Sequence, residues 1–405
     1  MQFFSKKSLQ RIKWRRKRKS LTKSKYYLNF VNKAELEAFP IMNKQSFMAN
    51  FNVINTAGIA LDQALKVAQD AETSRDFSSE INKVTVGLSS GTSGNRGVFL
   101  ASESERAQWV ATIIDRVLGF SLKKRNVAFF LRANSNLYES VKSRLIQFNF
   151  FDLLEPLPQH VDRLNSLKPN ILVAQPSMLL LLAKEVSEGR LKFNLQKIIS
   201  VAEVLYPEDR IKLESIFNQI IHQVYQCTEG FLAATCKAGV LHFNEDFLII
   251  EKKYIDDEKK RFHPIITDLE RNTQPVIRYE LNDIIHEKTQ CSCGSNWMAI
   301  ESIEGRSDDI LTFNNTQGES VKIFPDFFRR TIIGASPKIT DYALICTGPI
   351  TLELCIPTDD DTYKKAKVAI QALLQSRAIT DVTIKRISHH KTKQTDKLRR
   401  IKNEN

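Results

Sequence analysis

The sequence predicts an α/β protein in two parts, a large layered α/β domain followed by a small α+β unit. Residues 126–200 alternate short apolar strands with helices, which is typical of a partly parallel sheet covered by helices. Beyond Phe231 the pattern changes to strands and hairpins. The polar run 305–309 then precedes a last stretch of about 100 residues, enough for a small domain. We therefore expect domains over 1–305 and 306–405.

Length and composition exclude several classes of protein. The 405 residues suit two or three domains, and 42% apolar with 26% charged residues are ordinary values for a globular chain, so disorder is not expected. No apolar run approaches the ~20 residues that a membrane span needs, and the basic N-terminus lacks the apolar core of a secretory signal. Six cysteines are too few for a disulfide scaffold. We therefore expect a cytoplasmic protein whose cysteines are thiols or metal ligands.

The net charge of +13 is concentrated at the two ends of the chain. Residues 1–25 contain eleven Lys or Arg and no Asp or Glu, and residues 385–405 carry a net charge of +6. A basic end can bind nucleic acid or anionic lipid. The other interpretation is a helix with a solvated basic face that packs on the body through its apolar residues: Phe3, Phe4, Leu9, Ile12, Trp14 and Leu21. We favour the second interpretation and expect no nucleic-acid partner.

Local patterns predict the individual elements. A basic helix is expected over 5–30, and a capping box at Ser102–Glu105 predicts the start of a second helix that carries Trp109 and Val117. Further helices are predicted over 137–148, 176–186, 207–218 and 363–374. Strands are predicted over 84–88, 97–101, 127–131, 171–174, 198–201, 342–346, 351–356 and 382–387.

A loop rich in glycine and hydroxyl groups follows the first predicted strand; it consists of Ser89, Ser90, Gly91, Thr92, Ser93 and Gly94. Glycines let backbone N–H groups close around phosphate oxygens, and the hydroxyls add donors. It is not a Walker A loop, because no Gly-Lys-Ser/Thr follows. Residues 87–91 also fit the nucleophile elbow of hydrolases, but a strand follows here where an elbow needs a helix. A plain surface hairpin is the remaining alternative.

Two further segments place polar side chains at strand ends. Tyr225-Gln226-Cys227-Thr228-Glu229-Gly230 follows an apolar strand. An aromatic ring, a hydroxyl and a carboxylate at such a strand end can stack on a base, contact a phosphate and bind Mg²⁺. In Arg278-Tyr279-Glu280-Leu281-Asn282-Asp283 the last carboxylate can accept hydrogen bonds from a ribose. Taken alone, each segment is also consistent with an ordinary turn.

In chain order the motifs form one series: the hydroxyl-rich loop, the aromatic-x-x-Thr-Glu segment, Asp283, Gly-Arg-x-Asp-Asp at 305–309 and a lysine near the end. This series resembles the adenylate-forming (ANL) superfamily of acyl-CoA synthetases, luciferases and peptide-synthetase adenylation domains. Cys-x-Cys-Gly at 291–294 is similar to the phenylacetate–CoA ligase branch, whose relatives include deazaflavin-cofactor adenylating synthetases. The resemblance spans nearly the whole chain. It implies a large adenylation domain and a small mobile C-terminal domain.

The resemblance implies a role for each matching residue of the large domain. The 89–94 loop would bind phosphate, although Arg96-Gly97 stands where the family has Pro-Lys-Gly. Glu203 matches the adenine-side segment. Tyr225 would stack on adenine, with Gln226 in place of a family glycine, while Thr228 would contact the α-phosphate and Glu229 would bind Mg²⁺.

Near and beyond the domain boundary the resemblance implies three binding or hinge residues and a lysine. Asp283 would bind the ribose, Arg306 matches the linker arginine, and Asp308 matches the hinge. Lys397, which precedes Leu398-Arg399-Arg400-Ile401, is the best match for the late catalytic lysine, and Lys391 and Lys393 are alternatives. Such a lysine would be delivered by domain motion and would help to neutralise the repulsion between a carboxylate and ATP.

Three cysteines and a histidine form a candidate metal site: Cys236, His242, Cys291 and Cys293. Three thiolates and an imidazole are a closed structural zinc set. The alternative is a group of buried thiols beside an exposed histidine, and we favour zinc. Cys346 and Cys355 lie inside strand patterns and are expected in the core.

The implied function is ATP- and Mg²⁺-dependent activation of a carboxylate as its acyl- or aryl-AMP, followed by transfer to CoA or to the thiol of an acyl carrier protein. Two alternatives stay open. One is AMP transfer to a cofactor without thiol ligation, and the other is a non-catalytic basic binding protein on the same fold. Pyrophosphate exchange would separate the enzymes from the binding protein. The sequence does not identify the carboxylate.

Overall fold

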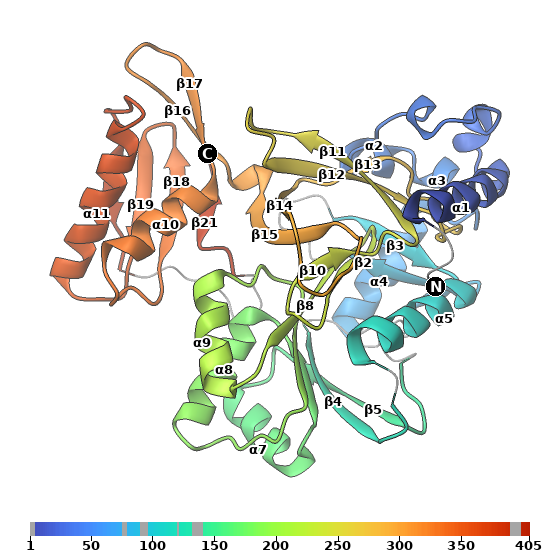
Figure 1. The fold of residues 1–405 in the computed structure, drawn as a ribbon, viewed down its shortest axis with the longest axis horizontal. Helices are drawn as coiled ribbons and strands as arrows, with labels where there is room; N and C mark the ends of the chain where they lie inside the picture. Colours follow the sequence, from blue (N-terminus) through green and yellow to red (C-terminus); the bar gives the residue numbers. More distant parts are fainter. Residues whose placement is uncertain (1–4, 75–78, 90–95, 120, 132–140, 389–397) are drawn as a thin grey trace. The chain divides into compact units, whose positions relative to one another are not determined.

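The computed structural model describes residues 5–74, 79–89, 96–119, 121–131, 141–388 and 398–405. The chain forms two compact units (Figure 1). The first consists of Met1–Leu281 and Ile285–Ser302, and the second of Asn282–Ile284 and Ile303–Asn405. The second unit thus begins close to the expected boundary at 305–306 and also takes in three residues from earlier in the chain.

A large mixed sheet is the frame of the first unit. Its strand order is β11-β12-β14-β15-β10-β9-β8-β7-β6-β4-β5, with β13 paired to β12. Neighbours from β5 to β8 are parallel, whereas β8–β9 and β9–β10 are antiparallel. The strands are β4 (Arg125–Leu131), β5 (Ile146–Asp152), β6 (Ile171–Ala174), β7 (Lys197–Ser200), β8 (Ile221–Cys227), β9 (Gly230–Thr235), β10 (Leu241–Phe243), β11 (Leu248–Tyr254), β12 (Arg261–Asp268), β13 (Tyr279–Glu280), β14 (Asp283–Lys288) and β15 (Ala299–Arg306).

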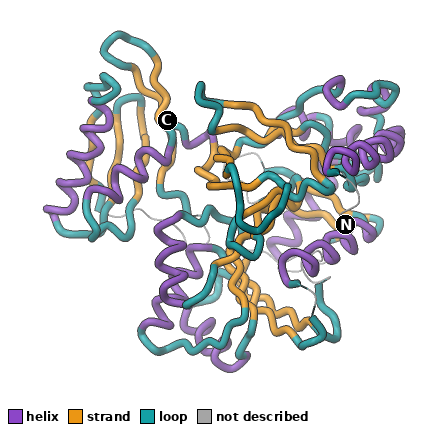
Figure 2. The backbone as a smooth tube through the Cα atoms, viewed as in Figure 1, coloured by secondary structure: helices purple, strands orange, loops and turns teal. Residues whose placement is uncertain are grey.

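The parallel part of this sheet is covered on both faces, because successive residues of a strand point to opposite sides. Ala128 and Phe130 of β4 pack in one buried cluster with three helices, which lie together in green in Figure 1. Val127 and Phe129 pack on the other face with Ile113. The three helices are α7 (Leu157–Leu167), α8 (Pro176–Ser187) and α9 (Pro207–Phe217). The predicted alternation of strands and helices is confirmed from β6 to α9 (Figure 2).

Helix α5 (Glu103–Thr112) begins at the predicted capping box. Ser102 Oγ accepts a hydrogen bond from the Glu105 amide at 3.4 Å, and Glu105 Oε2 accepts one from the Ser102 amide at 2.8 Å. The helix continues as a π-helical turn, η4 (Ile113–Leu118), before Gly119 ends it with a φ of 76°. Glycine suits this left-handed backbone because it has no Cβ.

One predicted helix is wrong in the part of it that the structure describes. A helix is predicted over 137–148, but Ile146 begins strand β5, which runs parallel to β4. Apolar Ile146, Phe148 and Phe150 alternate with Gln147 and Asn149, a period of two that suits a strand. Pairing with β4 decides between the two periodicities.

The basic N-terminal helix is shorter than predicted. Helix α1 spans Lys6–Ser20, and two 3₁₀ turns follow, η1 (Leu21–Lys23) and η2 (Tyr27–Phe30). Trp14, Lys17 and Leu21 are buried, so the helix packs on the body as the favoured interpretation expects. Ile12, which is expected to share in this packing, is exposed, because it lies on the opposite side of the helix from the buried residues. The remaining elements before the large sheet are η3 (Leu36–Ala38), α2 (Lys44–Ala49), α3 (Phe51–Ile54), α4 (Leu61–Ser74) and the three-stranded sheet β1 (Glu80–Ile81), β2 (Val84–Leu88) and β3 (Val98–Ala101).

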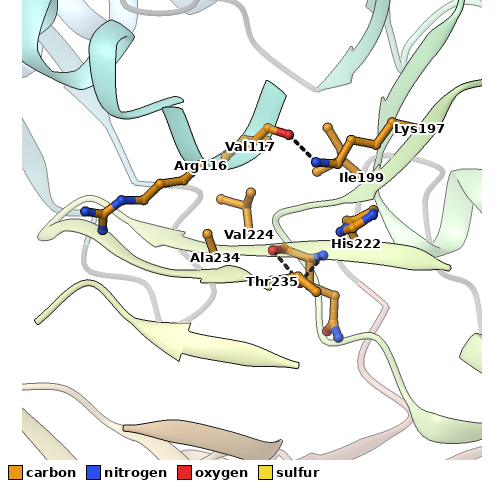
Figure 3. Close-up of a pocket in the computed structure, with 9 residues that line it drawn as sticks. Arg116, Val117, Lys197, Ile199, His222, Val224, Ala234 and Thr235 are labelled. Atoms are coloured by element: carbon orange, nitrogen blue, oxygen red, sulfur yellow. Dashed lines mark hydrogen bonds between the residues drawn. The ribbon is translucent and has the colours of Figure 1, made fainter. Parts of the chain in front are cut away.

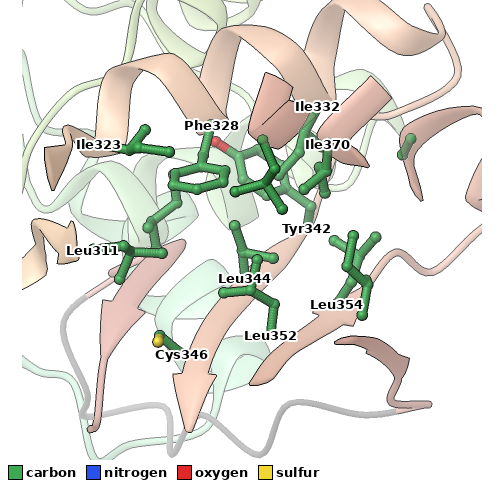
Figure 4. Close-up of a cluster of buried hydrophobic side chains, with 14 of the residues drawn as sticks. Leu311, Ile323, Phe328, Ile332, Tyr342, Leu344, Cys346, Leu352, Leu354 and Ile370 are labelled. Carbon is green, nitrogen blue, oxygen red and sulfur yellow. The ribbon is translucent and has the colours of Figure 1, made fainter. Parts of the chain in front are cut away.

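The second unit is a small α+β structure. Its four-stranded sheet has the order β20-β19-β18-β21, and β16 and β17 form a separate hairpin. Figure 4 shows Phe328 and Ile332 packing against Leu344 and Leu352 of the sheet. The elements are η5 (Ser307–Asp309), β16 (Leu311–Asn314), β17 (Ser320–Ile323), α10 (Pro325–Ala335), β18 (Ala343–Gly348), β19 (Thr351–Cys355), α11 (Asp360–Gln375), β20 (Thr383–Arg386) and β21 (Ile401–Asn403).

Among the described residues of the whole chain, no helix is long and apolar enough to cross a membrane.

Candidate functional site

The turn between β8 and β9 carries the central group of predicted residues. Strand β8 ends at Cys227 and β9 begins at Gly230, so Thr228 and Glu229 form the tip of the turn. The pairing register of β8 with β9 shifts between Tyr225 and Gln226, which marks a β-bulge. Such a bulge changes the direction of nearby side chains and is common beside functional sites.

The carboxylate of Glu229 is held at both oxygens. Thr228 Oγ1 donates to Oε2 at 2.9 Å, and the hydroxyl of Tyr279 donates to Oε1 at 2.7 Å. Burial, and then the negative charge of Glu229, raises the pKa of Tyr279, so the phenol remains a donor. The side chain of Glu229 is therefore fixed in one orientation, as a carboxylate ligand of a divalent cation needs to be.

Gln226 is directed toward helix α5. Its Oε1 accepts a hydrogen bond from Trp109 Nε1 at 3.2 Å. The Gln226 side chain, at a position where the resemblance implies a glycine, is thus anchored to helix α5. The Tyr225 ring lies 6.4 Å from the ring of Phe243, and its role in stacking on adenine stays a prediction.

Of the predicted phosphate loop, Ser89 is described, and residues 90–94 lie outside the described residues. Ser89 Oγ accepts a hydrogen bond from the Gly97 amide at 2.7 Å, and the carbonyl of Ser89 accepts one from Arg96 Nε at 3.1 Å. Arg96 also forms a two-pronged ion pair with Glu72, at 2.6 and 2.7 Å. Arg96, near the position of the missing family lysine, therefore closes the base of the loop.

Glu203 follows β7 and caps helix α8. Its carboxylate accepts hydrogen bonds from the amide and the hydroxyl of Ser177, each at 3.1 Å. The preceding Ala202 has a φ of 66°, in the left-handed region that a side chain makes costly. Strain of this kind is common at functional sites, and contact of Glu203 with a nucleotide stays a prediction.

The predicted residues of the second unit lie around η5. Arg306 Nε is 3.6 Å from Asp283 Oδ1, and Asn282 Nδ2 donates to Asp308 Oδ2 at 3.0 Å. Arg399 forms an ion pair with Asp309. Lys397, Lys391 and Lys393 lie outside the described residues.

The four predicted metal ligands come together although two of them lie far along the chain from the other two. Cys236 Sγ is 3.7 Å from Cys291 Sγ, Cys293 Sγ is 3.4 Å from His242 Nε2, and all four ligand atoms lie within 4.8 Å of one another. Ligands of a tetrahedral zinc ion are about 3.5–3.8 Å apart, given Zn–S bonds of about 2.3 Å. The donors therefore fit a single metal ion.

The surroundings of this cluster favour metal binding as well. His242 Nδ1 lies 3.0 Å from the carbonyl of Trp297; donating its proton there would leave the Nε2 lone pair for a metal. A hydrogen bond from the Cys293 amide lowers the pKa of Cys291 to about 7, which favours its thiolate, whereas burial raises the pKa of Cys293.

A small cavity of about 10 Å³, room for about one water, lies between η4 and strands β7 to β9. Figure 3 shows Lys197 directed across it to the carbonyl of Val117, at 2.5 Å. Burial, followed by the charges of Lys197 and Arg210, lowers the pKa of His222 at its edge to about 4. Burial also lowers the pKa of Lys197. The cavity is too small for a substrate.

The chain was compared with protein families, curated proteins and solved structures. No family model matches it. Indoleacetate–lysine synthetase of Pseudomonas savastanoi is 24% identical over 232 residues, which make up 53% of this chain and 56% of that protein. The match therefore spans just over half the length of this curated relative.

Solved structures match over much more of the chain. A 2-hydroxyisobutyryl-CoA ligase in its postadenylation state, in complex with an acyl-AMP, aligns with a TM-score of 0.67 and 14% identity over 98% of this chain and 88% of its own. The amide bond synthetase McbA of Marinactinospora thermotolerans aligns with a TM-score of 0.56 and 10% identity; the alignment covers 78% of this chain and 68% of that protein. The chain has the adenylate-forming ligase fold. The fold that the motif resemblance implies is thereby confirmed.

On this adenylate-forming ligase fold, two contacts of the β8–β9 turn escape sequence reasoning. Tyr279 lies inside the predicted ribose segment, but only the strand pairing of β12 with β13 shows that its hydroxyl reaches Glu229. Arg271 donates to the carbonyl of Thr228 at 2.7 Å and belongs to none of the predicted motifs. No local signal marks such contacts, because both depend on how distant strands pair.

Proposed function

We propose that this protein activates a carboxylate with ATP, forming an acyl- or aryl-adenylate and pyrophosphate. The carboxylate oxygen attacks the α-phosphorus, a new P–O bond forms, and the bond to the pyrophosphate leaving group breaks. The observation that carries the proposal is the doubly held carboxylate of Glu229 beside the hydroxyl of Thr228, at the strand end where the motif series expects the nucleotide.

Both reactants are anions, so the chain must offset their repulsion. We assign Glu229 to hold Mg²⁺, which would supply positive charge at the phosphates. The hydroxyl of Thr228 has a single proton, which Glu229 accepts in this structure. This hydroxyl would turn from Glu229 to donate to the α-phosphate, and the 89–94 loop would donate to the other phosphates. Asp283 would bind the ribose, with Arg306 beside it. Asp308 as hinge and Lys397 as the late catalytic lysine complete the proposal.

The test is ATP–pyrophosphate exchange across a panel of aryl and fatty acids. Exchange that depends on one class of acid supports adenylation and identifies the substrate class. A non-catalytic binding protein on this fold would exchange no pyrophosphate with any acid, and that result would refute the proposal.

The acceptor of the acyl group is a separate question. We propose a thiol, of CoA or of an acyl carrier protein, as the first candidate, because the ligase that aligns over 98% of the chain is named for CoA. An amine is the second candidate, because the name of the curated relative specifies lysine and the name of McbA specifies amide bond synthesis. Incubating the acyl-adenylate with CoA, a carrier protein or lysine, and analysing the products by mass spectrometry, would distinguish them.

We further propose that Cys236, His242, Cys291 and Cys293 hold a structural zinc ion. The ligand spacing supports four-coordinate binding with no open position, which suits a structural role. The ion would join the β9–β10 turn to the segment before β15. Metal analysis of protein purified without chelators should find about one zinc per chain.

A further inference from the structure

We propose that Arg271 and Lys17 are positioning residues that hold the Thr228–Glu229 turn, which makes the basic N-terminal helix part of the site. The inference rests on the proposed function, because it concerns the same magnesium and phosphate site. It starts from the segment Asp268–Gln274, which begins with the last residue of β12 and which none of the motifs includes.

Arg271 connects the turn to the strand that leaves the phosphate loop. Its Nη1 donates to the carbonyl of Thr228 at 2.7 Å, and its Nη2 donates to Gln274 Oε1 at 2.7 Å. Gln274 is buried and bonds to the backbone of β3 on both sides, accepting from the Leu100 amide at 3.0 Å and donating to the Val98 carbonyl at 3.0 Å. One guanidinium thus links the Thr228–Glu229 turn, through Gln274, to strand β3.

The bonded carbonyl belongs to the peptide that joins Thr228 to Glu229. Because the peptide unit is planar, the bond to this carbonyl restrains the peptide plane between the two Cα atoms, and with it the ψ of Thr228 and the φ of Glu229. Tyr279 and Thr228 then hold the carboxylate at its far end. Without Arg271 the carbonyl would lose this donor, and the Thr228–Glu229 peptide would be held less firmly between the paired residues Cys227 and Gly230.

Lys17 holds Arg271 from the other side. It is 2% exposed, and its Nζ donates to the carbonyl of Arg271 and, at 3.3 Å, to Asn272 Oδ1. Asp268 accepts the amides of Glu270 at 2.8 Å and Arg271 at 3.0 Å. The backbone of Arg271 is therefore held at its N–H by Asp268 and at its C=O by Lys17.

The burial of Lys17 needs a reason, since its neighbours Arg15 and Arg16 on the same helix are exposed. Removing an ammonium from water is costly, and methionine would fill similar space without that cost. Burial lowers the pKa of Lys17 to about 8, while the charge of Asp268 opposes the shift. The ammonium of Lys17, which donates hydrogen bonds to Arg271 and Asn272, therefore explains why a lysine stands here: it supports the 268–274 segment.

The test measures metal binding besides activity. Binding of Mn²⁺ in the presence of α,β-methylene-ATP is followed by electron paramagnetic resonance in the wild type, Arg271→Lys and Lys17→Met. We expect binding to weaken by about 10- to 100-fold in Arg271→Lys, as is typical when the support of a metal ligand is lost, and the Mg²⁺ concentration needed for exchange to rise with it. Lys17→Met should also weaken Mn²⁺ binding and raise the Mg²⁺ concentration needed for exchange.

Leu182→Ala is the matched control, because Leu182 is fully buried in the cluster under α8 and belongs to neither the turn nor the 268–274 segment. It should lower the melting temperature and leave Mn²⁺ binding unchanged. If Arg271→Lys and Lys17→Met behave like this control, the two residues are merely structural and the inference is wrong. If Arg271→Lys does not fold, Lys17→Met decides alone, since it leaves Arg271 in place.

The two proposals fail in different ways. A wild type that binds Mn²⁺ and nucleotide but exchanges pyrophosphate with no acid would overturn the proposed activity and leave the positioning role standing. Unchanged Mn²⁺ binding in both variants, together with wild-type exchange, would overturn the positioning role alone. A wild type that binds no Mn²⁺ with the nucleotide would overturn both.

Discussion

The hydroxyl of Tyr279 donates a hydrogen bond of 2.7 Å to the carboxylate of Glu229, fifty residues earlier in the chain. The bond joins the short strand β13 to the tip of the β8–β9 turn. Because Thr228 holds the other carboxylate oxygen, the charge of Glu229 is presented in a single direction. A preorganised charge acts on a ligand without the cost of reorientation during the reaction.

Glu229→Gln should abolish Mg²⁺-dependent pyrophosphate exchange while the protein stays folded. The amide keeps the size of the side chain and can still accept from Tyr279, but it lacks the charge that binds the cation. We expect a loss of at least about 100-fold in exchange, measured at saturating ATP. Glu301→Gln is the control, since it removes the charge of an exposed carboxylate paired with Lys288. Equal exchange in both variants would show that the Thr228–Glu229 segment is an ordinary turn.

Cys291→Ser should lose zinc and stability together, because a structural metal contributes to the free energy of folding. We expect less than one zinc per chain by metal analysis and a cost on the order of several kcal/mol in unfolding free energy. Cys346→Ala, in the core of the second unit, should keep its zinc. A zinc-free wild type with the same stability as Cys291→Ser would contradict the assignment.

His222→Gln should make the protein less sensitive to acid. Burial lowers the pKa of His222 to about 4, below the value of about 6.5 in an unfolded chain. Between these values the unfolded chain binds more protons, so wild-type stability should fall as the pH drops from about 6.5 to 4. We expect about 1–2 kcal/mol from this residue, since its ring is only partly buried.

The comparison is made by urea unfolding of both proteins at pH 7 and pH 4.5. His160, whose pKa is lowered by burial as well, contributes with the same sign in both proteins, so the difference isolates His222. Parallel losses of stability in the wild type and in His222→Gln would show that His222 does not titrate in this range.

Lys397→Ala should cut acyl-adenylate formation by about 100- to 1000-fold, the usual cost of removing one preorganised donor. Nucleotide binding should be nearly intact, because Thr228, Glu229 and Asp283, and not Lys397, are proposed to hold the nucleotide. Transfer from preformed acyl-adenylate should be less affected. Single-turnover assays of this variant beside Lys391→Ala and Lys393→Ala identify the lysine. Loss in one of the other two would move the assignment, and full activity in all three would show that the step does not use a late lysine.

Local pattern alone predicted much of the fold. The strands 84–88 and 171–174 and the capping box at Ser102 are confirmed residue for residue, because alternation and capping depend on neighbours in sequence. The helix predicted over 137–148 is wrong where it meets β5. The apolar residues of this segment fit both a helical and a strand period, and pairing with β4 selects the strand.

By itself the sequence determined the order of the motifs, the two-part α/β architecture and the identity of four candidate metal ligands, since these follow from residue types and spacing. Only the tertiary structure decided which residues meet. It brings Tyr279 to Glu229, Arg271 to Thr228 and Lys17 beneath Arg271. The physical reason is that these contacts depend on strand pairing and on the packing of α1, which join segments from 43 to 254 residues apart.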